Sequence, residues 1–292
     1  MFSSARSTAA VLAVALLSAC SSAIDEPEAA RPAGEDGRYG LLVMTHDFGD
    51  PGVAVSGQLA AWSGQPRAAV LHALALPDMA WLVAGVPAVG HCRAVSAPRT
   101  SIADGSAGQV TLLGAGELTV TPPGPLSPDD ALHLQPREFP RLFFSVGGVV
   151  YDADAPQALP FLAHGTYHVR APGDEVGPIV GDVQAPGPVH LLDETVGAEG
   201  LHVRWSGRGA AMLTLSRESG GAVRGVQCRA PAGGSFLVPA AALVPFGPGE
   251  AQLSVGEVSR RRVTVAGLSA LDLFFVSRDQ AVVRLPSDPV NE

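Results

Sequence analysis

The sequence has no lysine, a single asparagine (Asn291) and few aromatic residues, which make up 5% of the chain. All 19 basic residues are therefore arginines, and 28 Asp and Glu residues give a net charge of −9. An acidic chain of this kind is a poor candidate for nucleic-acid binding. Charged residues amount to only 16% and hydrophobic residues to 47%, a composition that excludes a wholly disordered protein.

Motifs of the common enzyme classes are also missing. No Gly-x-Ser-x-Gly sequence is present, so the nucleophile of an α/β-hydrolase is absent. Gly114-Ala115-Gly116 lacks the third glycine of a dinucleotide site. Asp47-Phe48-Gly49 stands without the glycine-rich loop and lysine of a kinase, and it predicts a turn. We therefore expect no enzymatic activity, no catalytic residues and no cofactor.

The N-terminus combines one positive charge, Arg6, with an apolar run over Ala9–Leu17 and the small residues Ser18-Ala19. This order is typical of a secretory signal. The run has nine residues, whereas a membrane-spanning helix needs about 20, so a permanent transmembrane anchor is not expected. An ordinary signal peptide, cut after Ala19 without further modification, remains an alternative at this point.

Leu17-Ser18-Ala19-Cys20 resembles the lipobox of bacterial lipoproteins. The resemblance implies that residues 1–19 are a signal peptide and that Cys20 receives a diacylglycerol on its thiol and an acyl chain such as palmitate on its amino group. Two or more acyl chains hold a protein stably on a membrane. Ser21, in place of aspartate, implies the outer membrane. The expected partners are the membrane, through Cys20, and the lipoprotein-processing and sorting machinery.

Beyond the lipobox, residues 20–38 are polar and rich in acidic residues, and they predict a disordered tether. The chain has 34 glycines and 25 prolines, which leave little room for long helices. Apolar and polar residues alternate cleanly in Thr166–Ala171 and Leu201–Ser206, as in strands with one buried face. The alternation places Trp205 inward. Pro239–Leu243 predicts one helical turn.

About eight short strands are expected in residues 201–292, a spacing typical of β-sandwiches. The predicted strands include 253–255, 263–265, 271–275 and 281–285. We expect an all-β fold with two tandem immunoglobulin-like β-sandwich domains, 39–190 and 191–292, with a seam near Pro186-Gly187-Pro188. In architecture this arrangement resembles immunoglobulin-like or fibronectin-type modules of bacterial surface lipoproteins.

Charge is distributed unevenly along the chain. Residues 20–200 carry a net charge of −13 and residues 201–292 a net charge of +3. Ordinary variation between domains is one explanation of this difference. The more specific alternative is that the C-terminal domain contacts an anionic surface. Arg260, Arg261 and Arg262 are the candidate contacts to such a ligand, although their charge by itself predicts a solvated loop.

The three cysteines are Cys20, Cys92 and Cys228. With Cys20 lipidated, the other two could form one disulfide. Alternation points both thiols inward on their strands, and we expect them in the separate cores of two domains. Two cysteines with Cα atoms more than about 7 Å apart cannot be bridged. The sequence therefore favours two buried free thiols over a disulfide.

Metal sites find little support in the sequence. His164 and His168 would lie about 13 Å apart on an extended strand, too far to share an ion unless Gly165 turns the chain. Asp152 and Asp154, and likewise Asp47 and Asp50, supply too few oxygens for Ca²⁺ and predict turns. We therefore expect no metal.

The leading hypothesis is a lipid-anchored cell-envelope protein with a structural or interaction role. Envelope proteins and acidic glycans are its further candidate partners. Two alternatives stay open. One is an adhesive or ligand-binding module for anionic glycans, which would use Arg260–Arg262. The other is a hydrolase with a dispersed site, for example His164 with Asp152.

Overall fold

A computed structural model describes residues 24–25, 35–65, 70, 85–98, 109–124, 130–138, 146–152, 159–219 and 222–286. The described chain is mostly β-strand, which confirms the expected all-β class. A helical turn, α3 (Ala240–Leu243), is followed by the 3-10 turn η3 (Val244–Phe246). The predicted helical turn at Pro239–Leu243 is therefore confirmed.

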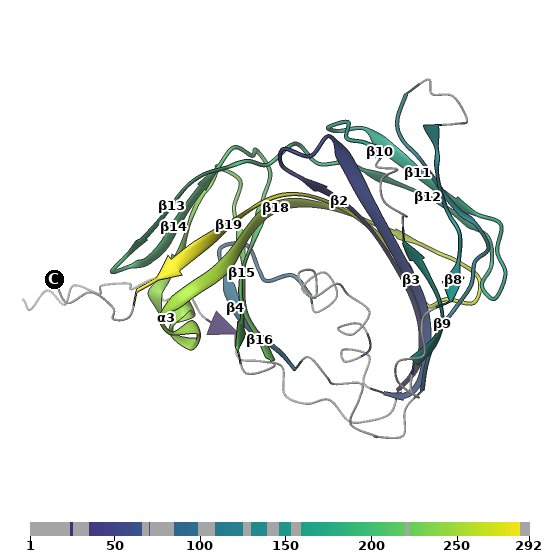
Figure 1. The fold of residues 1–292 in the computed structure, drawn as a ribbon, viewed down its shortest axis with the longest axis horizontal. Coiled ribbons are helices and arrows are strands. Elements are labelled where there is room, and N and C mark those ends of the chain that lie inside the picture. The colour runs from purple at the N-terminus through teal and green to yellow at the C-terminus, as the bar shows by residue number, and fades with distance from the viewer. Residues whose placement is uncertain are drawn as a thin grey trace, which may run out of the picture.

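One large, curved sheet dominates the fold (Figure 1). Its twelve strands follow the order β1-β4-β16-β15-β18-β19-β2-β3-β5-β9-β8, with β10 also paired to β3. Their bounds are β1 Ile24–Asp25, β4 Cys92–Pro98, β16 Ala222–Ala230, β15 Ala211–Ser219, β18 Gly249–Val263, β19 Leu271–Leu285, β2 Glu35–Asp47, β3 Gly52–Gln65, β5 Gln109–Leu112, β9 Val146–Asp152, β8 Arg137–Glu138 and β10 Leu159–Pro160.

Two smaller sheets cover the convex face of the large sheet (Figure 1). The first has the order β12-β11-β6-β7 and the second the order β13-β14-β17. Their bounds are β12 Ile179–Gln184, β11 Thr166–Ala171, β6 Leu118–Thr121, β7 Leu132–Leu134, β13 Leu191–Gly197, β14 Gly200–Trp205 and β17 Ser235–Pro239.

Strand β19 supplies apolar side chains to three separate cores. Leu271, Leu273 and Phe275 pack under the first small sheet. Val283 and Leu285 pack under the second small sheet. Phe274 and Val276 point to the opposite, concave face, where a third apolar cluster lies. Because successive side chains of a strand alternate between faces, one long strand can hold both layers of the molecule together.

The expected division into two tandem immunoglobulin-like sandwiches is not confirmed, and the strand order differs from it. β19, from the second half, pairs in parallel with β2, from the first half, along residues 271–278 and 40–47. The large sheet therefore continues through both halves. Only the covering sheets change at Pro186–Pro188, which lies between β12 and β13.

Several strands are longer than the sequence indicated. β18 runs without a break through 253–255 and ends at Val263, and β19 joins the predicted strands 271–275 and 281–285. Polar residues such as Arg278 and Gln280 interrupt the apolar pattern, so the sequence predicted two strands where there is one. Their backbones nevertheless pair with β18. Trp205 is buried in β14, as its alternation predicted.

The predicted disordered tether also needs correction. Within residues 20–38, β2 already begins at Glu35, and β1 pairs with β4 at Ile24–Asp25. Backbone hydrogen bonds to a sheet are indifferent to side-chain polarity, so composition alone missed both segments. The signal peptide, Cys20 and residues 26–34 lie outside the described residues.

The prediction of two free thiols is wrong, because Cys92 and Cys228 form a disulfide. The two cysteines lie directly opposite each other on β4 and β16, with Cα atoms 4.0 Å apart. Alternation correctly placed both side chains inward. The error was to assign them to different cores, since β4 comes from the first half of the chain but joins the sheet of the second half.

Replacing both Cys92 and Cys228 with alanine should lower the free energy of unfolding by roughly 3–5 kcal/mol, because the bridge closes a long loop. The sequence separation of the two cysteines is 136 residues. Urea unfolding of both proteins measures the difference, with Cys20→Ala as a control that should leave stability unchanged. Alkylation of Cys92 and Cys228 in unfolded but unreduced protein would contradict the bridge.

Candidate functional site

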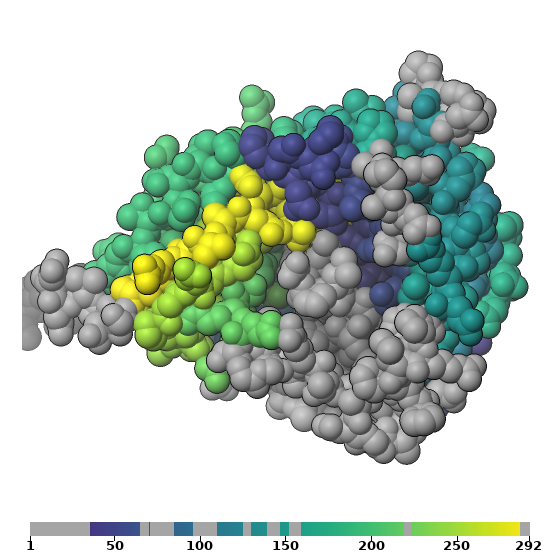
Figure 2. All heavy atoms as spheres, in the orientation of Figure 1, coloured from purple at the N-terminus to yellow at the C-terminus, as the bar shows by residue number. Residues whose placement is uncertain are grey.

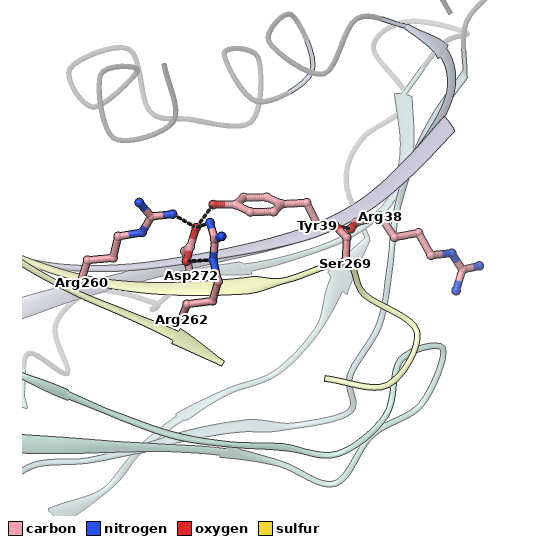
Figure 3. A network of polar contacts seen from close by, with 6 residues as sticks. All are labelled: Arg38, Tyr39, Arg260, Arg262, Ser269 and Asp272. Atoms are coloured by element: carbon pink, nitrogen blue, oxygen red, sulfur yellow. Dashed lines mark hydrogen bonds and ion pairs between the residues drawn. The ribbon is translucent and has the colours of Figure 1, made fainter. Parts of the chain in front are cut away.

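Four polar side chains meet on the concave face of the large sheet (Figure 3). Arg260 and Arg262 are two residues apart on β18 and so share a face. Asp272 lies directly opposite Arg262 on β19, and Tyr39 reaches the same carboxylate from β2. We call these four residues the Asp272 cluster. It joins three neighbouring strands across the middle of the large sheet.

The Asp272 carboxylate is the centre of this cluster. Arg262 donates to it twice, Nε to Oδ1 and Nη2 to Oδ2, each at 2.9 Å. Arg260 Nη2 and the Tyr39 hydroxyl both donate to Oδ2 at 2.5 Å. The Asp272 side chain is 0% exposed, whereas Arg260 and Arg262 are 45% and 57% exposed. A buried charge is tolerated when it is paired and hydrogen-bonded, as it is here.

The surroundings of Asp272 act on its pKa in opposite directions. Burial raises the pKa, but hydrogen bonds from Arg262, Arg260 and Tyr39 outweigh burial and lower the pKa to about 2. The pKa of Tyr39 is raised, first by burial and then by the hydrogen bond to the Asp272 carboxylate. Asp272 is therefore ionised and Tyr39 neutral at ordinary pH. Neither residue is poised to transfer a proton near neutrality.

Apolar side chains surround the Asp272 cluster. The Arg260 guanidinium carbon lies 5.4 Å from the centre of the Phe274 ring, within the range of a cation–π contact. Tyr39 and Phe274 belong to the apolar cluster of the concave face, together with Leu41, Val43, Val276 and Met212. Two guanidiniums against one carboxylate leave a net charge of +1 at the edge of this apolar surface, so the cluster can attract a small anion.

This geometry changes the interpretation of the arginine triplet. Arg260–Arg262 lies within β18 and not in a solvated loop. Arg260 and Arg262 project to the concave face, and Arg261 projects to the other side of the strand. Two of the three arginines are already paired with Asp272. The triplet therefore does not form one continuous cationic surface.

No sequence pattern marked Asp272 or Tyr39 as a member of this site. The available signal was Asp272 itself, the single acidic residue within the otherwise apolar run Leu271–Val276. A carboxylate in such a run usually has a cationic partner when it is buried. Its partner could not be chosen from ten arginines in residues 201–292 without knowing which strand lies beside β19.

A second polar arrangement surrounds His46 at the end of β2. Its Nδ1 atom lies 3.3 Å from Ser277 Oγ, and its Nε2 atom lies 2.9 Å from the carbonyl oxygen of Asp50. The His46 ring stacks on Phe161. Burial lowers the pKa of His46, which favours its neutral form. A serine beside a histidine resembles a nucleophile with its base. Ser277 is 0% exposed, however, and therefore cannot reach a substrate in this conformation.

The histidine and aspartate candidates do not form a site among the described residues. His164 occupies a turn with a φ of 61°, and His168 lies on β11. Asp50 Oδ1 accepts a hydrogen bond from Gly52 N, and Asp47 pairs with Arg278. The Asp152 side chain and Asp154 lie outside the described part of the chain. No three His, Cys, Asp or Glu side chains gather as metal ligands in the described ranges.

Among described residues, no helix is long and apolar enough to cross a bilayer. No protein-family model, curated protein or solved structure matches the chain.

Substituting Asp272→Asn should destabilise the protein by about 3–5 kcal/mol, because two guanidiniums lose the carboxylate that holds them. The neighbouring substitution Arg261→Gln is the matched control and should change stability by less than about 0.5 kcal/mol. Chemical unfolding of the three proteins measures both effects. Equal stability of Asp272→Asn and the parent protein would show that the cluster does not stabilise the sheet.

The Asp272 cluster also predicts a dependence of stability on pH. The pKa of Asp272 is lowered from 3.8 to about 2 in the folded protein. Its contribution of about 2 kcal/mol is therefore fully present above the unfolded pKa and is lost as the pH falls through the folded pKa. The stability difference between the parent and Asp272→Asn should shrink on titration from about pH 5 to about pH 2. A constant difference over this range would contradict the assignment.

Proposed function

We propose that the protein is a lipid-anchored component of the cell envelope with a structural or interaction role and no catalysis. The observation that carries this proposal is the Cys92–Cys228 disulfide. Disulfides persist mainly in oxidising compartments outside the cytosol. The bridge uses two of the three cysteines, and Cys20 alone is left for lipid attachment. Its position directly after Leu17-Ser18-Ala19 is the one that a lipobox requires.

In this proposal the acylated Cys20 places the protein in the outer membrane, after processing and sorting as a lipoprotein. The two small sheets, each packed on part of the large sheet, support an interaction role. They make rigid sandwiches whose loops and faces can bind envelope proteins, as immunoglobulin-like modules do. Arg260–Arg262 does not favour an acidic glycan as the partner, because Asp272 already pairs with two of the three arginines.

Replacing Cys20 with alanine should abolish acylation and move the protein from the membrane to the soluble fraction. Metabolic labelling with a palmitate analogue, followed by membrane fractionation, measures both changes. The matched control is Ser21→Ala, which should still be acylated and membrane-bound. Unchanged labelling and fractionation of Cys20→Ala would overturn the anchor, and so would an unlabelled parent protein.

A further inference from the structure

The position of β1 limits how far the folded protein can stand from its proposed anchor. Ile24 and Asp25 pair in parallel with Cys92 and Arg93 of β4, at one end of the large sheet. Cys20 precedes Ile24 by four residues, a length that spans at most about 14 Å when fully extended. If Cys20 is acylated, as the proposed function requires, the bilayer surface lies within that reach of β4.

Exposed apolar side chains lie at the same end of the sheet. Val86, Val89 and Val244 are 46%, 48% and 76% exposed. The backbone of Val89 bridges to Arg229 of β16, α3 contacts β4, and η3 contacts β16. Figure 1 shows β4 and β16 at the end of the curved sheet that lies opposite β8 and β9, with α3 beside them. In Figure 2 the yellow-green atoms of the α3–β18 region lie on the surface beside the end of β19. We call residues 85–98 and 222–248 the disulfide end.

The charge of the disulfide end differs from that of the whole chain. Its two segments carry Arg93, Arg224 and Arg229 and no Asp or Glu, although the chain has a net charge of −9. Acidic residues lie beside the two segments: Glu218 is opposite Val223, the Glu199 carbonyl oxygen accepts a hydrogen bond from Ala240 N, and Glu250 follows the second segment. Arg224 donates a hydrogen bond to the Pro245 carbonyl at 3.2 Å, and this contact places η3 next to β16.

The three arginines lie on both faces of the sheet. Arg224 shares a face with the buried Cys228, whereas Arg93 and Arg229 share the opposite, concave face. If the bilayer meets the sheet at its edge, the long arginine side chains of both faces can reach the headgroups. Exposed valines beside arginines, in segments that carry no acidic residue of their own, are the chemistry that suits the interface of an anionic bilayer.

We propose that the disulfide end rests on the anionic headgroups of the bilayer that holds Cys20. In this arrangement the valines enter the membrane interface and the arginines contact phosphate groups. The acyl chains on Cys20 hold the disulfide end close to the bilayer, so even a weak contact is occupied. The occupant is the bilayer itself. Docking orients the large sheet edge-on to the membrane and leaves the first small sheet, β12-β11-β6-β7, free for partners.

Amide hydrogen exchange of the lipidated full-length protein tests this orientation. The protein is reconstituted into vesicles of phosphatidylcholine alone or of an equal mixture with phosphatidylglycerol. Residues 85–91 and 240–247 should exchange more slowly in the mixed vesicles, while exchange within β19 should be the same in both. Addition of salt should remove the difference, because mobile ions screen exposed charges.

A pair of variants tests the role of the arginines. Each arginine near an anionic surface contributes about fivefold to the binding equilibrium, so Arg224→Gln with Arg229→Gln should reduce docking roughly 30-fold. The matched control is Arg170→Gln with Arg261→Gln, which removes two exposed arginines from β11 and from the far half of β18 and should leave protection unchanged. Unaltered exchange in β19 shows that each variant is folded.

The outcomes separate this proposal from the proposed function. A protein that fails to float with vesicles contradicts the lipid anchor. A protein that floats but exchanges equally in both kinds of vesicle keeps its anchor and overturns the docking. A soluble acidic polysaccharide that protects residues 85–91 where anionic vesicles do not would identify a glycan as the occupant and would also overturn bilayer docking.

Discussion

The fold depends on the double pairing of β19. This strand is antiparallel to β18 along all of its 15 residues and parallel to β2 along eight. A parallel pair needs a long connection, and here the connection is most of the chain, from β2 to β19. The two halves therefore share one sheet, and neither can complete its core alone. Side chains from β19 enter both convex cores and the concave apolar cluster.

The same strand carries Asp272, the one fully buried carboxylate among the described residues of the concave face. A buried charge is costly, and Arg260, Arg262 and Tyr39 offset that cost by supplying four hydrogen bonds. These bonds link β2, β19 and β18 through side chains where their backbones are already paired. They also fix the direction of the two half-exposed guanidiniums of Arg260 and Arg262.

The disulfide end includes an edge of the large sheet, which has to be protected from other chains. A strand at the edge of a sheet exposes unpaired backbone groups that can associate with other chains. Here the Cys92–Cys228 bridge fastens β4 to β16, and β1 pairs with the outer side of β4. The proposed lipid attachment is four residues from β1. The disulfide between β4 and β16, the pairing that covers the edge of β4 and the proposed contact with the bilayer therefore lie at the same end of the sheet.

The sequence by itself determined the all-β class, the inward direction of Trp205 and Cys228, and the helical turn after Pro239. Each of these follows from local rules: a period of two along a strand, or the residues that begin a helical turn. Only the tertiary structure decided that Cys92 meets Cys228, that Tyr39 reaches Asp272 and that β2 lies beside β19. Alternation tells which face a side chain takes but not which strand lies next to it, because partners 136 or 231 residues apart are selected by the packing of the whole chain.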